Sequence, residues 1–424
     1  MPAATAYLIV GVAAALTTAL ATPVIRRAAA GAGLVVAPDE RHVHEYSMPN
    51  LGGLAMLAGL VAGLAVAWGV GDFSAVFATP TEMIGLLVAA TLICAVGTLD
   101  DVRPVSAPAK VAGMVAAGSV LSLAGVSLLV LRIPFLDLIL LSPDLSALFT
   151  VVWVVLIANA VNLIDGLDGL ATGIVGIAAA TFLLYAVRLG DAGVLFEGNP
   201  GALLAVLILG ICVGFLPHNI HPARIMMGDG GSMLLGLLMA ASTVSVGGRT
   251  DAPFSGQSFF FFAPLFIPLF ILGVPLFDMT FAIVRRIATR GLRVTQADKD
   301  HVHHRIMKLG HGHRRAVFIL WAWTALLSSF VLWPTYTGEG DAIVPTGIAA
   351  VCLLLFTVLH PRLRTARHPV YREGRPRLRT GARGGAEAGG VDEDGCAHTR
   401  VGCHAVAGDE GVALPRDREY IHKR

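Results

Sequence analysis

Two long apolar runs joined by a short polar motif decide the fold class of this chain. Residues 146–187 read SALFTVVWVVLIANAVNLIDGLDGLATGIVGIAAATFLLYAV, with two amides and two carboxylates between stretches that carry no charge. A helix needs about 20 apolar residues to cross a bilayer, and both runs approach that length. Their uninterrupted apolar character favours helices over the alternating strands of a membrane β-barrel.

Further runs of the same kind lie on both sides of this pair. The chain is predicted to be all-α, a polytopic membrane protein with about eleven transmembrane helices. The fifth and sixth of these spans are expected to be short and close together, which fits a loop that dips into a site. The predicted spans are residues 5–25, 51–70, 82–99, 108–131, 146–163, 169–188, 200–217, 231–247, 259–284, 315–333 and 342–360.

The overall composition agrees with a membrane protein. Of the 424 residues, 55% are hydrophobic and 14% are charged, against about 25% charged in a soluble domain. The last 63 residues hold 22 of the 60 charges. We therefore predict an integral membrane domain over residues 1–361 and a disordered, cytoplasmic, Arg/Gly-rich tail over residues 362–424. The net charge of +2 gives no reason to expect a nucleic-acid partner.

The basic residues predict the orientation in the membrane. Counted over alternate connections between the predicted spans, 15 of the 18 Lys and Arg residues before the tail fall on one side and 3 on the other. Because basic connections stay in the cytoplasm, the N-terminus is expected outside and the tail inside. The expected location is a multi-pass protein of the cell membrane.

Polar side chains gather at the ends of the predicted spans on the cytoplasmic side. Two adjacent carboxylates, Asp100 and Asp101, repel each other unless a cation or a proton lies with them. The Gly-rich turn around Asp229 begins a predicted span, where free N–H groups favour a phosphate. The five groups lie in residues 38–53, 100–110, 159–169, 219–232 and 301–315.

The amides and carboxylates of residues 159–168 recur every three positions, so on one helix they would be neighbours. The histidine-rich group, residues 301–315, is compatible with zinc, with phosphate binding or with a solvated basic loop. Taken together, the five groups favour phosphoryl-group chemistry at the inner membrane surface. A transporter remains the alternative from another class, although its ionisable residues would be expected nearer the bilayer midplane.

Four motifs in this order resemble the polyprenyl-phosphate N-acetylhexosamine-1-phosphate transferases. They are Gly97-Thr-Leu-Asp100-Asp101 with Lys110, Asn159-Ala-Val-Asn162-Leu-Ile-Asp165-Gly-Leu-Asp168-Gly, Met227-Gly-Asp229-Gly-Gly-Ser232 and His301-Val-His303-His304-Arg305. The resemblance covers about residues 5–360 and leaves out the tail. It implies that the enzyme takes a UDP-N-acetylhexosamine and a polyprenyl phosphate from the bilayer. The products would be a polyprenyl-diphosphate-sugar and UMP, with Mg²⁺ required and Mn²⁺ as an alternative.

The resemblance also implies roles for individual residues. Asp229 would be the main Mg²⁺ ligand, with Asn162 and Asp101 near it. Asp100 would be the first choice and Asp165 the second choice for the proton acceptor, with Asp101 in the same catalytic set, and a covalent aspartyl-phosphate route stays open. The substrate-binding residues would be Lys110, Asn159, Asp168, Asn219, His301, His303, His304 and Arg305.

The motif His301-Val-His303-His304-Arg305 resembles the branch of the family that uses UDP-N-acetylglucosamine. The alternative within the family is a phospho-N-acetylmuramoyl-pentapeptide transferase, and a homodimer is left open. This sequence departs from the usual family pattern at three positions, where His42, Met226 and Gly230 replace residues that are commonly Lys, Phe and Thr.

Overall fold

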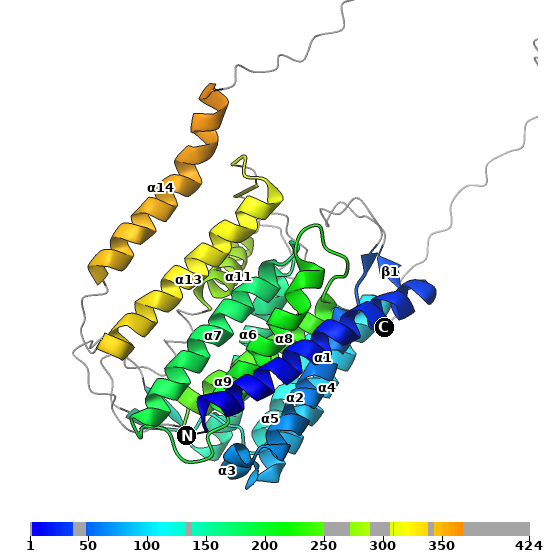
Figure 1. The fold of residues 1–424 in the computed structure, drawn as a ribbon, viewed down its shortest axis with the longest axis vertical. Coiled ribbons are helices and arrows are strands. Elements are labelled where there is room, and N and C mark those ends of the chain that lie inside the picture. The colour runs from blue at the N-terminus through cyan, green and yellow to red at the C-terminus, as the bar shows by residue number, and fades with distance from the viewer. Residues whose placement is uncertain are drawn as a thin grey trace, which may run out of the picture. The chain divides into compact units, whose positions relative to one another are not determined.

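The computed structural model describes residues 2–36, 48–132, 138–249, 272–288, 306–307, 309–337 and 343–367, and these are mostly helical (Figure 1). Eight of the described helices are long and apolar enough to cross a membrane. These eight are α1 (Ala4–Gly31), α2 (Gly52–Gly69), α4 (Pro80–Val102), α6 (Pro143–Ile164), α7 (Leu170–Asp191), α8 (Gly201–Asn219), α9 (Gly228–Gly247) and α13 (His313–Thr337).

The remaining described helices are shorter or carry a shorter apolar stretch. They are α3 (Ser74–Phe77), α5 (Ala107–Leu123), α11 (Gly273–Ala288), α14 (Ile343–Arg367) and the 3-10 turn η1 (Gly71–Phe73). Half of the predicted ninth span, residues 259–271 of 259–284, lies outside the described residues. A polytopic helical protein is therefore observed, whereas the count of eleven spans and the outward N-terminus stay predictions.

The prediction of an all-α chain is wrong in detail, because two short β-hairpins are present. Strands β1 (Val35–Val36) and β2 (Met48–Pro49) pair antiparallel, as do β3 (Val130–Arg132) and β4 (Leu138–Leu140). The predicted span 108–131 is wrong in its last third, since α5 ends at Leu123. The chain then turns at Gly125, whose φ of +103° is a conformation that favours glycine.

The fifth and sixth spans were expected to be short, and this expectation is wrong. Helices α6 and α7 contain 22 residues each, enough to cross the apolar part of a bilayer. The polar motif between them is a tight turn at their junction. Helix α14 continues to Arg367, beyond the predicted boundary at residues 361–362. The rest of the predicted tail lies outside the described residues, so its disorder stays a prediction.

Helix α9 lies in the middle of the bundle, where it packs against α2, α4, α6 and α8 (Figure 1). Every residue of α9 except Asp229 is buried. Close approach depends on glycine: a Cβ on Gly97 of α4 would lie 2.5 Å from the backbone nitrogen of Gly230. The site described below is built around the N-terminal end of this central helix.

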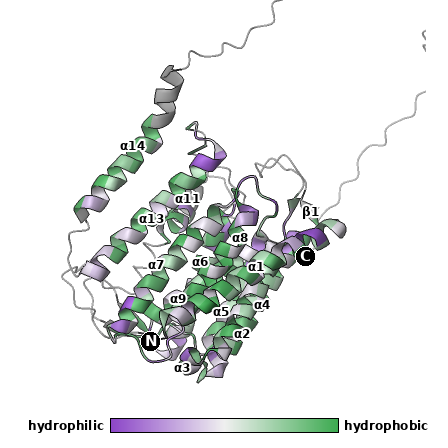
Figure 2. Ribbon diagram, in the orientation of Figure 1, coloured by the Kyte–Doolittle hydropathy of each residue, from purple (hydrophilic) through white to green (hydrophobic). Residues whose placement is uncertain are grey.

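The outer helices expose apolar side chains, as expected for surfaces in contact with lipid. Figure 2 shows hydrophobic residues along the lengths of the helices, with hydrophilic residues mainly near helix ends and connections. Helix α14 packs on α13, and much of its surface is apolar and exposed. Its exposed apolar residues include Val344, Ile348, Val351, Leu354, Leu355, Phe356 and Leu359.

Candidate active site at the helix ends

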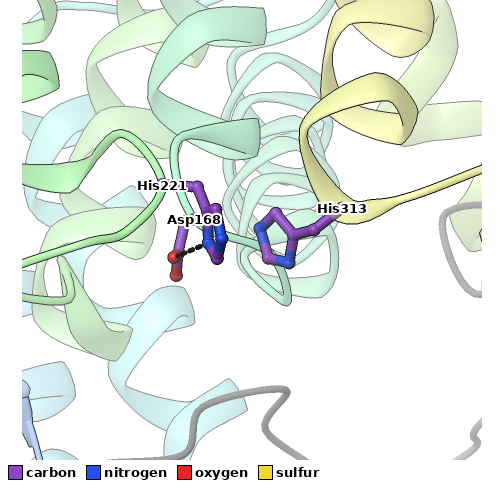
Figure 3. Close-up of side chains that lie close together, drawn as sticks. All are labelled: Asp168, His221 and His313. Carbon is purple, nitrogen blue, oxygen red and sulfur yellow. Dashed lines mark hydrogen bonds and ion pairs between the residues drawn. The ribbon is translucent and has the colours of Figure 1, made fainter.

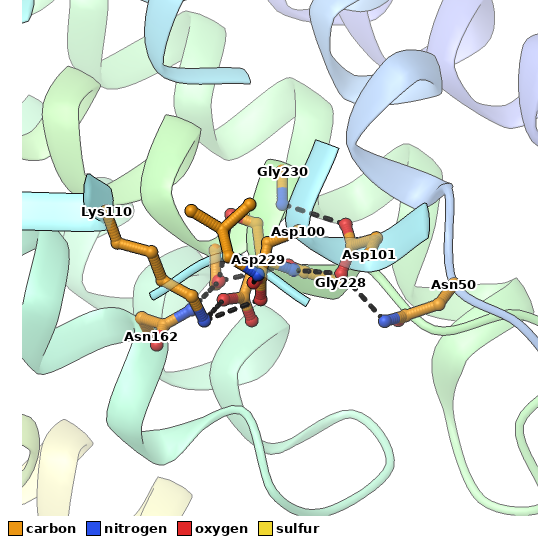
Figure 4. A network of polar contacts seen from close by, with 10 residues as sticks. Asn50, Asp100, Asp101, Lys110, Asn162, Gly228, Asp229 and Gly230 are labelled. Carbon is orange, nitrogen blue, oxygen red and sulfur yellow. Dashed lines mark hydrogen bonds and ion pairs between the residues drawn. The ribbon is translucent and has the colours of Figure 1, made fainter. Parts of the chain in front are cut away.

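Four helix ends bring a charged network together (Figure 4). Asp100 and Asp101 lie at the end of α4, Lys110 in the first turn of α5, Asn162 near the end of α6 and Asp229 at the start of α9. These residues are far apart in sequence and were predicted to share a site. The structure confirms that they share one region of the protein; the chemical role of each residue stays a prediction.

Lys110 connects two of the carboxylates. Its Nζ lies 2.5 Å from Oδ2 of Asp100 and 2.6 Å from Oδ2 of Asp229. Oδ1 of Asp100 also accepts a hydrogen bond of 2.6 Å from the backbone N–H of Val105. The side chains of Asp100, Lys110 and Asp229 are between 15 and 26% exposed, so a ligand arriving from solvent can reach them.

Asp101 binds the N-terminus of α9 instead of facing a ligand. Its Oδ1 accepts hydrogen bonds from the N–H of Asp229, at 2.9 Å, and from Nδ2 of Asn50, at 2.8 Å. Its Oδ2 accepts the N–H of Gly230 at 3.1 Å. A carboxylate at this position satisfies N–H groups that have no partner within the helix and favours the positive end of the helix dipole.

This contact corrects the expectation that the Gly-rich turn offers its N–H groups to a phosphate. The N–H groups of Asp229 and Gly230 are occupied by Asp101, and Gly228 adopts a φ of +71° at the turn. The Asp229 side chain, by contrast, faces Lys110. The turn therefore presents the Asp229 carboxylate to the site, together with the Lys110 ammonium group that pairs with it.

The Gly52-Gly53 pair at the start of α2 permits a close backbone approach. Gly52 donates its N–H to the carbonyl of Met226 at 3.1 Å, and Gly53 donates to that of Met227 at 2.9 Å. A Cβ on Gly53 would lie 2.5 Å from the carbonyl carbon of Gly230. The start of α2 is thus fixed against the turn that begins α9.

The polar series at positions 159, 162, 165 and 168 does not lie on one helix, which corrects that expectation. Asn159 and Asn162 are on α6, Asp165 ends the helix, and Asp168 lies in the following turn. Nδ2 of Asn162 donates to Oγ of Ser232 at 3.0 Å, which joins α6 to α9. Nδ2 of Asn159 lies 3.5 Å from Sδ of Met279, and so faces α11.

Asp165 lies between carboxylates that come from three segments. Removal from solvent, and then the charges of Asp229, Asp101 and Asp168, raise the pKa of Asp165 well above its usual value. A carboxyl group with a raised pKa binds a proton more readily than an ordinary carboxylate. Of the two predicted proton acceptors, Asp165 therefore has the environment suited to a base, whereas Asp100 is held in an ion pair.

A second group of side chains lies at the turn after α6 (Figure 3). Asp168 is 2% exposed, and its Oδ2 accepts from Nδ1 of His221 at 2.7 Å and from the N–H of Ala223 at 3.1 Å. The ring of His313 stacks on that of His221, with centroids 4.3 Å apart. Candidate metal-ligand atoms of these three side chains lie within 4.8 Å of one another. Because Asp168 and His221 bond to each other, we interpret the carboxylate as orienting the imidazole ring and not as a second ligand of the same metal ion.

Asn219 was predicted to bind substrate, but the hydrogen bonds of its side chain are made to other residues of the protein. It is 1% exposed. Its Oδ1 accepts from the N–H of Gly169 at 3.1 Å and from Oγ1 of Thr172 at 2.8 Å, and its Nδ2 donates to the carbonyl of Ile225 at 3.1 Å. These bonds join the end of α8 to the start of α7. The nucleotide-binding role stays a prediction.

The predicted phosphate-binding residues His301, His303, His304 and Arg305 lie outside the described residues, as does His42. Of the other two departures, Met226 is 7% exposed and packs in the interior. At Gly230, a Cβ would lie 2.6 Å from Oγ1 of Thr98. The hydroxyl group of Thr98 therefore lies where a side chain at position 230 would begin.

The network contains oxygen atoms of the kind that could hold a divalent cation. Asp100 and Asp229 share one cation, Lys110, and Asp165 adds a further carboxyl group nearby. Carboxylate and amide oxygens are the protein ligands that Mg²⁺ prefers. The hydrogen bond from Asn162 to Ser232 uses the amide nitrogen, so it does not occupy the amide oxygen. Both oxygens of Asp101 already accept from N–H donors, which makes Asp101 the least suitable of the predicted ligands.

Sequence reasoning did not single out Asn50 as a partner of Asp101 or His221 as a partner of Asp168. The signals were present in the sequence: Asn50 precedes the glycine pair, and His221 stands in the same connection as Asn219 and Asp229. Both contacts join segments more than 50 residues apart. Spacing within one segment cannot reveal such pairs.

Comparisons with known proteins point in the same direction. The sequence model of glycosyl transferase family 4 matches residues 83–247. The chain is 38% identical over 359 residues to the decaprenyl-phosphate N-acetylglucosaminephosphotransferase of Mycobacterium tuberculosis, covering 82% of this chain and 89% of that protein. The protein of the same name from Mycobacterium leprae is 38% identical over 361 residues, or 82% of this chain and 90% of the relative.

Similarity to proteins with another donor is weaker. The phospho-N-acetylmuramoyl-pentapeptide-transferase of Staphylococcus aureus is 25% identical over 329 residues, which cover 73% of this chain and 92% of that protein. Over similar shares of the chains, the identity is 38% to the Mycobacterium tuberculosis protein and 25% to the Staphylococcus aureus protein.

The contacts of Asp101 lead to a prediction about stability. Asp101→Ala should lower the apparent unfolding temperature in detergent, because the N–H groups of Asp229 and Gly230 and the amide of Asn50 lose their acceptor. Each buried donor left without a partner costs about 1–3 kcal/mol. Asp191→Ala, at an exposed carboxylate that ends α7, is the matched control and should melt like the unaltered protein. Equal melting of all three proteins would contradict the anchoring role.

Proposed function

The chain belongs to glycosyl transferase family 4, and from this membership we propose that it transfers N-acetylglucosamine 1-phosphate from UDP-N-acetylglucosamine to a polyprenyl phosphate. The products are polyprenyl-diphosphate-N-acetylglucosamine and UMP. This reaction would be the first membrane step in the synthesis of a cell-wall glycopolymer. The observation that carries the proposal is the similarity, over most of both chains, to the mycobacterial decaprenyl-phosphate enzymes.

We assign the diphosphate of the donor to the network around Asp229. Asp229, Asp100 and the amide oxygen of Asn162 would hold Mg²⁺, which supplies charge neutralisation for the departing UMP. Lys110 holds the Asp100 and Asp229 carboxylates in place and offers its ammonium to phosphate oxygens. Asp101 keeps the start of α9, and with it Asp229, in position.

The acceptor phosphate is proposed to lose its remaining proton to Asp165. The carboxyl group of Asp165 has the raised pKa that such a role needs, whereas Asp100 is paired with Lys110. The phosphate oxygen then attacks the β-phosphorus of the UDP-sugar, and the bond from that phosphorus to the UMP oxygen breaks. Positioning of the two substrates is expected to contribute more than proton transfer, because a polyprenyl phosphate is largely ionised near neutral pH.

The active site is proposed to face the cytoplasm. The described polar network lies at helix ends that follow or precede the basic connections of the chain, and basic connections stay inside. The alternative donor, a UDP-N-acetylmuramoyl-pentapeptide, is less favoured because the relatives that carry that name are less similar. A transporter is less favoured because the acids of the network lie at helix ends and not midway along the spans.

The decisive experiment measures UMP release from membranes supplied with polyprenyl phosphate and one UDP-sugar at a time. Inverted vesicles, whose cytoplasmic face is outside, should release UMP with UDP-N-acetylglucosamine, and should release little with the pentapeptide donor. Sealed right-side-out vesicles should become active only after permeabilisation, because the donor cannot cross the bilayer.

Two outcomes would contradict parts of this proposal. Efficient turnover of the pentapeptide donor would refute the choice of sugar and leave the phosphoryl chemistry. Activity in sealed right-side-out vesicles would refute the cytoplasmic orientation. Absence of UMP release with every UDP-sugar would remove the enzyme assignment itself.

Asp229→Asn tests the metal assignment. The substitution keeps the shape of the side chain and removes the charge that faces Lys110, so the protein should remain folded and lose most of its turnover. The expected loss is roughly a hundredfold or more, equivalent to about 3 kcal/mol in the activation barrier. Steady-state rates at several Mg²⁺ concentrations measure it. Near-normal turnover at ordinary Mg²⁺ concentrations would show that Asp229 does not hold the ion.

Asp165→Asn tests the proton acceptor through the pH dependence of the rate. A base with a raised pKa must be deprotonated to act, so the rate of the unaltered enzyme should fall as the pH drops through that pKa. Asp165→Asn should lower the rate and abolish this acidic limb, and the deficit should shrink at high pH, where the acceptor phosphate is fully ionised. If Asp100→Asn abolishes the limb and Asp165→Asn preserves it, then Asp100 is the acceptor.

A further inference from the structure

Helix α14 contains a break in its hydrogen-bond ladder. In an α-helix the carbonyl of each residue accepts the N–H of the residue four positions later. The residue four positions after Thr357 is Pro361, which has no N–H. The carbonyl of Thr357 therefore has no helical donor, although Thr357 is only 8% exposed.

His311, from the segment that precedes α13, supplies the missing donor. Its Nε2 lies 2.8 Å from the carbonyl oxygen of Thr357, and its side chain is 3% exposed. Because a carbonyl can only accept a hydrogen bond, Nε2 must carry the proton. The His311 ring also lies 6.2 Å, between centroids, from that of Phe356. A buried histidine thus joins two segments that are 46 residues apart.

The segment around His311 is held from more than one direction. Gly310 turns the chain with a φ of +100° and donates its N–H to the carbonyl of Met307 at 2.9 Å. Two residues beyond His311, the His313 ring stacks on His221 beside Asp168. Because His311 and His313 are two residues apart, the contact of His311 with α14 also restricts the position of His313 beside Asp168 and His221.

We propose that His311 is a positioning residue: its bond to the Thr357 carbonyl docks the cytoplasmic segment 306–313 on α14 and so holds that segment against the substrate site. The proposal rests on the proposed function for the identity of the substrate. In the sequence, the histidine-rich motif at residues 301–305 directly precedes this segment. Helix α14 then serves the active site as well as the membrane.

A purely structural role would be to satisfy the Thr357 carbonyl, and the sequence offers a way to separate the two roles. Pro361→Ala restores an N–H four residues after Thr357, which gives the carbonyl a helical donor without any contribution from position 311. Alone, Pro361→Ala should leave kinetics nearly unchanged, because a carbonyl oxygen can accept two hydrogen bonds. Combined with His311→Ala, it should repair α14 but leave the segment undocked.

The experiment compares full-length protein in nanodiscs as His311→Ala, His311→Gln, Pro361→Ala and the His311→Ala/Pro361→Ala double variant. His311→Ala should raise the KM for UDP-N-acetylglucosamine about tenfold, equivalent to about 1.4 kcal/mol, and lower the unfolding temperature. His311→Gln, which keeps an N–H donor, should largely restore both. The double variant should regain the unfolding temperature and keep the raised KM.

Amide hydrogen exchange over residues 306–316 gives a readout that needs no turnover. Exchange should be faster in His311→Ala and in the double variant than in the unaltered protein, and near normal in His311→Gln. Faster exchange in a protein that never releases UMP would support the docking and refute the proposed function. A double variant with normal KM and normal exchange would overturn the docking, as would His311→Ala with both unchanged.

Discussion

The carboxylate of Asp101 receives the first N–H groups of α9, and the rest of the site depends on this contact. It fixes the end of α4 to the start of the central helix, with bonds of 2.9 and 3.1 Å to Asp229 and Gly230. The same carboxylate holds Asn50, at the start of α2. Asp100 is the neighbour of Asp101 in the chain, and Asp229 donates its N–H to Asp101. The contact therefore brings the side chains of Asp100 and Asp229 close enough for both to pair with Lys110.

The two adjacent carboxylates of α4 have different hydrogen-bond partners and therefore different roles. Of two adjacent carboxylates, Asp101 turns inward, where backbone donors satisfy it, and Asp100 turns toward Lys110. Charged groups held in this way cost little reorganisation when a substrate arrives, which is how a preorganised site stabilises charge that develops during a reaction. The second group consists of Asp168, His221 and His313. Asp165 lies near both groups, because the charges of Asp168 from the second group and of Asp229 and Asp101 from the first all raise its pKa.

Much of this arrangement could be predicted from the sequence because hydropathy and motif order are local signals. Apolar runs located the helices, and the acids and amides at their ends proved to be neighbours. The hairpin after α5 was missed because residues 124–131 are about as apolar as those of a span, so the turn at Gly125 was not recognised as the end of the helix. The roles of Asp101 and His311 were not predictable, since each depends on a partner from a distant segment: the start of α9 for Asp101 and a proline-exposed carbonyl for His311.

The enclosure of α9 has a consequence for how the protein is made. Among the eight candidate spans α9 has the lowest mean hydropathy, and it is the one buried throughout. A segment with such a weak preference for lipid gains its place mainly from its neighbours. Helices α2, α4, α6 and α8 precede it along the chain, so all four partners of α9 are synthesised before α9 itself. The order of the helices in the sequence is thus compatible with insertion of α9 last among these five helices.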